Sequence, residues 1–127
     1  MSYIDDAYSW ITEVVPNNSI IIEYKVLRIE NCINSEIDGE FVPPNKISVN
    51  ILRFREIPIE ILVLFHELGH YFNYIESPEK YLVASEKDKE YIADKYMIEK
   101  AKQYGFENEA TNLAKKHKET VGYSYEL

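Results

Sequence analysis

The sequence lacks features that would place it at once in several classes of protein. It has a single cysteine, Cys32, so no framework of intrachain disulfides can hold the fold. Its longest unbroken apolar run, residues 61–65, is far shorter than the roughly 20 residues that span a bilayer. The first residues have neither the basic nor the apolar stretch of a cleaved secretion signal. These absences predict a cytoplasmic protein.

Basic residues are also scarce. The chain has 14 Lys and Arg against 22 Asp and Glu, a formal net charge of −8. An acidic surface repels phosphate backbones and anionic lipids, so we expect neither nucleic acid nor a membrane as its partner. The 127 residues are 46% hydrophobic and 28% charged, which is ordinary for a globular protein. We therefore expect a single domain over residues 1–127.

The spacing of apolar residues predicts a helix and then strands in the first half of the chain. Residues 3–15 place their apolar side chains on one side of a helix. Residues 19–29 and 46–53 alternate apolar and polar side chains, as strands do. Between them, Asp38-Gly39 is a dipeptide typical of a hairpin turn.

The second half predicts three helices. Pro58 suits the first turn of a helix over residues 58–75, which is apolar nearly all round and is therefore expected in the centre of the fold. Ser85 caps a second helix that runs to residue 104 and stops at Gly105. A charged helix over residues 108–120 ends before Gly122. Helix, strands and then helices indicate an α+β fold.

The central helix contains His66-Glu67-Leu68-Gly69-His70. Histidines four residues apart share one face of a helix, so both imidazoles can reach one metal ion. Glu67 is one step round the helix, where it can take a proton from an attacking water molecule. The alternative is that His66 and His70 are core histidines with ordinary hydrogen bonds.

A catalytic Zn²⁺ needs a third protein ligand. His117 is a poor candidate because it lies 47 residues after His70. Glu90 is better, since it is a carboxylate on an otherwise apolar stripe of the next helix, and a metal ion would remove the cost of burying it. The apolar members of the stripe are Ala93, Met97, Ala101 and Tyr104.

Asp94 lies near the same face as Glu90. A carboxylate in that place can accept the free ring N–H of a ligand histidine and so select its tautomer. The alternative is that both carboxylates are solvated and pair with Lys87 or Lys95.

The segment His66-Glu67-Leu68-Gly69-His70 followed by Glu90-Tyr91-Ile92-Ala93-Asp94 resembles the HExxH…ExxAD signature of the gluzincin metallopeptidases. The resemblance covers about residues 46–104. It implies that Glu90 is the third zinc ligand and that Asp94 hydrogen-bonds His66. It also implies a zincin-like domain in which a short sheet lies in front of an active-site helix, a glutamate helix and a C-terminal helix.

The short chain is similar to the minigluzincins and to the ImmA/IrrE group of small intracellular peptidases, without the helix-turn-helix found beside some of the latter. The resemblance implies a zinc metalloendopeptidase that acts on peptides or proteins. The alternative function is a latent or regulatory zinc-binding domain that acts on one partner protein. A gluzincin also has a Tyr or His that stabilises the oxyanion, and the candidates here are Tyr71, Tyr74, Tyr96, Tyr123 and His117.

Three further features each allow two interpretations. Cys32 is either a small buried hydrophobic residue or a zinc ligand of a latent form. Residues 46–53 form either a central strand or an edge strand that pairs with an extended peptide. The tail, residues 122–127, is either a frayed terminus or an inhibitory strand that lies beside residues 46–53 and shields the zinc.

Overall fold

The computed structural model describes residues 4–25, 38–50 and 57–127. The fold is α+β, as predicted: an N-terminal helix, a three-stranded mixed sheet and then four helices. Cys32 and the parts of the predicted strands at residues 26–29 and 51–53 lie outside the described residues. The elements are α1 (Ile4–Asn17), β1 (Ile21–Lys25), β2 (Gly39–Val42), β3 (Lys46–Asn50), α2 (Ile57–Glu76), α3 (Pro78–Val83), α4 (Glu86–Gln103) and α5 (Glu107–Val121).

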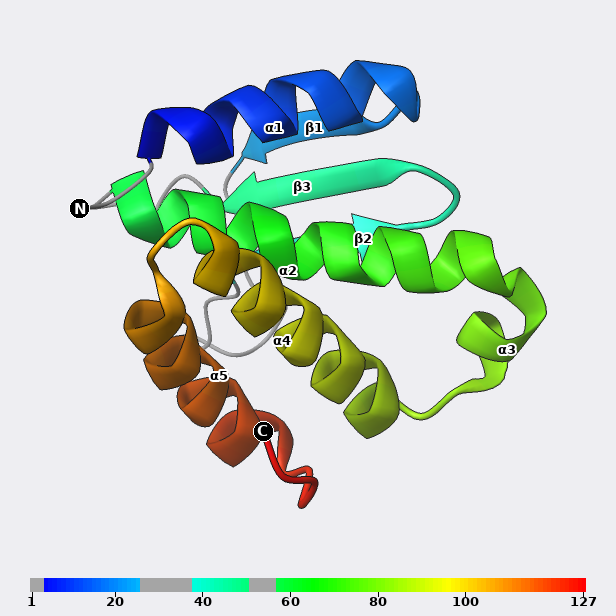
Figure 1. Cartoon of the computed structure of the whole chain (residues 1–127). Helices are drawn as coiled ribbons and strands as arrows, with labels where there is room; N and C mark the ends of the chain where they lie inside the picture. Colours follow the sequence, from blue (N-terminus) through cyan, green and yellow to red (C-terminus); the bar gives the residue numbers. More distant parts are fainter. Residues whose placement is uncertain (1–3, 26–37, 51–56) are drawn as a thin grey trace.

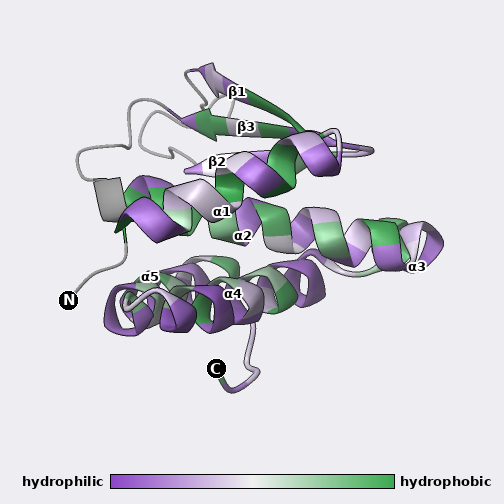
Figure 2. Cartoon of the chain, turned by 45° about the horizontal axis from the view of Figure 1, so that its top comes forward, coloured by the Kyte–Doolittle hydropathy of each residue, from purple (hydrophilic) through white to green (hydrophobic). Residues whose placement is uncertain are grey.

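Helix α2 runs through the middle of the molecule, with α1 and the sheet on one side and α4 and α5 on the other (Figure 1). Its side chains from Ile61 to Tyr71 are all buried, which confirms the prediction of a central helix. Helices α4 and α5 are mostly hydrophilic and turn their smaller apolar faces inward (Figure 2). The arrangement places the middle of α2 between the sheet and the α4–α5 pair.

Strand β3 is the central strand of the sheet. It pairs in parallel with β1 and antiparallel with β2, and Ile47 and Val49 are fully buried. The interpretation of this segment as an edge strand is therefore wrong for its described part, residues 46–50. Of the described strands, β1 and β2 form the two edges of the sheet.

The predicted hairpin turn at Asp38-Gly39 is also wrong. Gly39 already pairs with Val49, and the amide of Asn50 donates to the carbonyl oxygen of Asp38. The turn that joins β2 to β3 is instead at residues 43–45, after Val42. Two consecutive prolines cannot donate to a sheet, so the strand has to end before them.

The predicted ends of the helices agree with the structure. The Ser85 side chain caps α4 by accepting a hydrogen bond of 3.1 Å from the amide of Asp88. Gly105 and Gly122, with φ of 83° and 87°, follow α4 and α5 in the left-handed conformation that glycine adopts most easily. Helix α3 was not predicted: Pro78 ends α2 but also begins a new short helix.

The close approach of α2 to α4 depends on Gly69. A Cβ atom at this position would lie 3.0 Å from Cβ of Tyr96 and 3.2 Å from Cα of Ala93. Both contacts are tighter than van der Waals packing normally allows, and both involve atoms close to or in the α4 backbone. The glycine between the two histidines therefore lets α4 come close enough for its side chains to reach the HExxH segment.

Candidate metal centre

His66 and His70 lie one turn apart on α2, and both are 5% exposed. Their rings meet edge to face with centroids 4.9 Å apart. A helix places residues i and i+4 on the same face, and the contacts of both histidines with Glu90 show that this face of α2 is directed toward α4. Both imidazoles therefore point at the same small volume.

Glu90, from α4, contacts both histidines. Its Oε2 atom is 2.9 Å from Nε2 of His66, and its Oε1 atom is 3.2 Å from Nε2 of His70. One ligand atom from each of the three residues lies within 4.8 Å of the others, so the group could hold a metal ion. The carboxylate that sequence analysis selected on α4 is thus brought to the two histidines on α2.

The chemistry of this donor set fits a divalent ion such as zinc, which binds imidazole nitrogen and carboxylate oxygen. Burial favours the neutral form of Glu90, but its contacts with His66 and His70 outweigh burial and lower its pKa. Burial also favours the neutral form of His66, which for a histidine means a lower pKa. Its contacts with carboxylates, first Asp94 and then Glu90, outweigh burial and raise the pKa well above the ordinary value. Without a metal ion, these shifts favour an ion pair between a protonated His66 and the Glu90 carboxylate. A divalent cation would displace that proton and take over the positive charge that the carboxylates stabilise.

Asp94 is completely buried on α4, one turn beyond Glu90. Its Oδ1 atom lies 2.9 Å from Nδ1 of His66. Nδ1 is the ring nitrogen that does not contact Glu90, because Glu90 contacts Nε2. The distance suits a hydrogen bond, but the angle does not: no described group makes a well-aligned hydrogen bond to this Nδ1. The contact still leaves Nε2 of His66 as the nitrogen that faces the candidate metal position.

His117, from α5, contacts Asp94 rather than Glu90. Its Nδ1 atom is 2.8 Å from Oδ1 of Asp94, and its Nε2 atom is 3.5 Å from Oδ2 of Asp38. Burial lowers the pKa of His117, but these two carboxylates outweigh it and raise the pKa to about 9. His66, Asp94 and His117 are also close enough for a metal ion. Because each ring nitrogen of His117 already faces a carboxylate, Asp94 or Asp38, we interpret that second group as an ion-paired network.

Tyr81, which no sequence motif indicates, contacts His70. It is buried on α3, and its hydroxyl lies 3.3 Å from Nδ1 of His70. Each of the two histidines therefore has a polar partner at Nδ1 while its Nε2 faces Glu90. In the sequence, Tyr81 is marked only by its position shortly after the HExxH helix. The pattern of apolar residues does not predict α3, the short helix that carries it.

Glu67 lies next to His66 on α2 and is only 3% exposed. Burial raises its pKa, and the nearby His66 and His70 offset this only in part. A Cβ atom on Gly39 would lie 3.1 Å from Oε2 of Glu67, so edge strand β2 runs directly against this carboxylate. A buried carboxylate with a raised pKa is suited to accept and return a proton.

The candidates for oxyanion stabilisation lie in different places. Tyr71 donates to the backbone oxygen of Asn18, 3.2 Å away, and Tyr74 and Tyr96 pack against other aromatic rings. His117 and Tyr123 both contact Asp94. No one of them is distinguished as the group that would meet an oxyanion.

The tail does not form the predicted strand. Gly122 turns the chain sharply after α5, and residues 123–127 have no strand conformation. Tyr123 is 3% exposed and donates to Oδ2 of Asp94 at 2.8 Å, so it is not frayed either. The tail packs against α4, where Tyr123 meets the ring of Tyr91 and donates to Asp94, and Tyr125 donates to Asp88.

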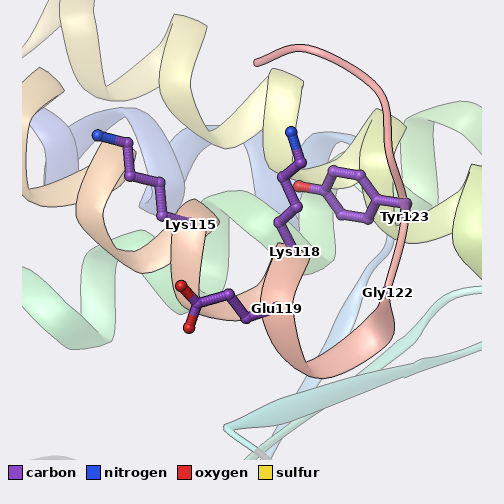
Figure 3. Close-up of a pocket in the computed structure, with 5 residues that line it drawn as sticks. All are labelled: Lys115, Lys118, Glu119, Gly122 and Tyr123. Carbon is purple, nitrogen blue, oxygen red and sulfur yellow. The ribbon is translucent and has the colours of Figure 1, made fainter.

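A hollow of about 440 Å³ lies where the tail leaves α5. Figure 3 shows Tyr123 on the tail beside the end of α5. The hollow contains none of the three candidate metal ligands, although Tyr123 connects it to Asp94. It is lined by Lys115, Lys118, Glu119, Gly122 and Tyr123.

Comparisons with protein-family models, with curated proteins and with solved structures give no match to this chain. In the parts of the chain that the structure describes, no helix has both the length and the apolar character to cross a membrane.

Proposed function

We propose that this chain is a zinc-dependent metalloendopeptidase of the gluzincin type, in which His66, His70 and Glu90 hold the ion. The observation that carries the proposal is the convergence of one ligand atom from each of these residues within 4.8 Å. The arrangement of HExxH on one helix, α2, and Glu on a later helix, α4, is that of the family which the sequence resembles. Two histidines and a carboxylate also leave one position of a tetrahedral zinc ion open.

Glu67 is the proposed general base. A zinc ion held by His66, His70 and Glu90 would supply a Lewis acid, which lowers the pKa of a water molecule to about 7 and polarises a peptide carbonyl. The Glu67 carboxylate takes the proton of the attacking water and returns it to the leaving amine nitrogen. Burial raises the pKa of this carboxyl, which brings its acid and base forms closer in free energy and suits both transfers.

Strand β2 is the proposed place for the substrate backbone. Among the described strands, it pairs only with β3, so its other side can accept an extended peptide. Gly39, the first residue of β2, lies against Oε2 of Glu67. A peptide aligned on this strand would pass close to the proposed general base.

A second candidate function is a regulatory zinc-binding domain that acts on one specific partner. The observation in its favour is burial, because both histidines are 5% exposed and the side chain of Glu90 is only 20% exposed. A site this closed would exclude many polypeptides unless a matching partner opens it.

Zinc content and hydrolysis of casein, an unstructured substrate, test the proposal with wild-type protein and Glu67→Gln. We expect both proteins to bind zinc, and we expect hydrolysis to fall at least about 100-fold in the variant, the lower range of general-base catalysis. Equal hydrolysis would show that Glu67 is not the base. Zinc binding without any hydrolysis by the wild type would favour the regulatory domain, and absence of zinc binding would reject both functions.

A further inference from the structure

We infer that Tyr123 is a positioning residue of the metal centre, which holds the Asp94 carboxylate and through it the ring of His66. The inference rests on the proposed metal site. It gives the C-terminal tail a role opposite to that of an inhibitor, since the tail would complete the site.

The contacts of Asp94 divide between its two oxygens. Oδ1 faces two imidazoles, with Nδ1 of His66 at 2.9 Å and Nδ1 of His117 at 2.8 Å. Oδ2 accepts the hydroxyl proton of Tyr123 at 2.8 Å. Asp94 has no exposed surface, so these side chains take the place of solvent around a charged group that is costly to bury.

The orientation of the carboxylate matters because His66 and His117 compete for the same oxygen. The contact from His117 to this oxygen is a well-aligned hydrogen bond, whereas the contact from His66 is poorly aligned. Tyr123 anchors the opposite oxygen and so opposes rotation of the carboxylate toward His117. Without this anchor, the His66 ring loses the partner that holds its Nε2 toward Glu90.

The tail holds Tyr123 firmly. Gly122 adopts the left-handed conformation and reverses the chain at the end of α5, which turns the next residue back toward α4. The ring of Tyr123 is buried and meets the ring of Tyr91 edge to face, with centroids 5.5 Å apart. Tyr125 provides a contrast, because it is 45% exposed and its hydroxyl donates to Asp88, away from the metal group.

Tyr123→Phe tests the inference, with Tyr125→Phe as a matched control that also removes one tail hydroxyl. Zinc affinity is measured by competition with a chelator, at a temperature where circular dichroism shows each metal-free protein to be folded. We expect zinc affinity to fall about 3- to 10-fold in Tyr123→Phe, less than the roughly 10- to 100-fold expected for Asp94→Ala. The visible spectrum of the Co²⁺ form should also change in Tyr123→Phe. The Tyr125→Phe protein should match the wild type in both measurements.

A double variant, Tyr123→Phe with Asp94→Ala, shows whether Tyr123 acts through Asp94. We expect it to bind zinc no more weakly than Asp94→Ala alone, because the hydroxyl would have nothing left to position. Equal affinity in wild type and Tyr123→Phe, or a further loss in the double variant, would overturn the inference while leaving the metal site standing. A wild-type protein without zinc affinity would instead reject the metal site itself.

Discussion

The hydroxyl of Tyr81 lies 3.3 Å from Nδ1 of His70, although the two residues belong to different helices, α3 and α2. Nε2 of the same ring faces Glu90. A histidine that binds a metal through Nε2 carries its proton on Nδ1, so in that state His70 donates to the Tyr81 oxygen. Because a hydroxyl can accept as well as donate, Tyr81 can serve as the partner of Nδ1 and hold the ring in the orientation that points Nε2 toward Glu90.

Replacing the Tyr81 hydroxyl should weaken zinc binding without abolishing it. For Tyr81→Phe we expect zinc affinity to fall about 10-fold, the lower end of the usual effect of outer partners of metal ligands. Chelator competition measures the change. Tyr74→Phe is a suitable control, because Tyr74 packs in the same aromatic cluster and no described contact links its hydroxyl to His70. Equal losses in both variants would point to packing rather than to the hydroxyl.

Removal of either ligand histidine should abolish stoichiometric zinc. A ligand that binds only the folded state stabilises it by about 2.7 kcal/mol when its free concentration is 100 times its dissociation constant. Zinc should therefore raise the melting temperature of the wild type and have no effect on His66→Ala or His70→Ala. Calorimetry with and without a chelator checks this. Stoichiometric zinc in both variants would contradict the ligand assignment.

Gly69→Ala should destabilise the protein even though alanine is the better helix former. The change gains about 1 kcal/mol of helix propensity, but the new methyl group would meet Cβ of Tyr96 and Cα of Ala93. Separating α2 from α4 costs about 1–3 kcal/mol, so we expect a net loss of about 1 kcal/mol in the free energy of unfolding. Urea denaturation measures it. Because the same shift moves Glu90 away from the histidines, zinc affinity should fall too. A stabilised variant with full affinity would show that the helices can adjust.

Gly39→Ala should reduce hydrolysis more than it reduces metal binding. The added methyl group would lie 3.1 Å from Oε2 of Glu67 and 3.0 Å from the carbonyl oxygen of Ser48. Displacing the proposed base by a few tenths of an ångström should lower the rate about tenfold, since a displacement of 1 Å costs on the order of 100-fold. Glu40→Ala, the next residue of β2, serves as control. Loss of zinc in Gly39→Ala would instead indicate a wider rearrangement of the strand.

Deletion of residues 122–127 distinguishes a supporting tail from an inhibitory one. The supporting role predicts weaker zinc binding and lower hydrolysis after deletion, because Asp94 loses its bond from Tyr123. Deletion of residues 124–127 alone keeps Gly122 and Tyr123 and should leave zinc affinity nearly unchanged. A rise in hydrolysis after the longer deletion, with zinc retained, would show that the tail restrains the enzyme.

The sequence by itself determined those parts of the site that depend on geometry within one helix. The spacing of His66 and His70 places both imidazoles on one face whatever surrounds them, because an α-helix repeats every 3.6 residues. The same periodicity singled out Glu90 as a carboxylate on an apolar stripe. Helix ends at Ser85, Gly105 and Gly122 also follow from local backbone preferences.

Only the tertiary structure decided which separate segments meet. Sheet order depends on pairing between distant strands, so alternation alone could not show that β3 is central or that Gly39 lies against Glu67. Tyr81 on α3 contacts His70, whereas His117 on α5 and Tyr123 in the tail contact Asp94. No spacing along the chain relates Tyr81 or Tyr123 to the HExxH segment. Their positions depend on how α3, α5 and the tail pack against α2 and α4, and that packing is a property of the whole fold.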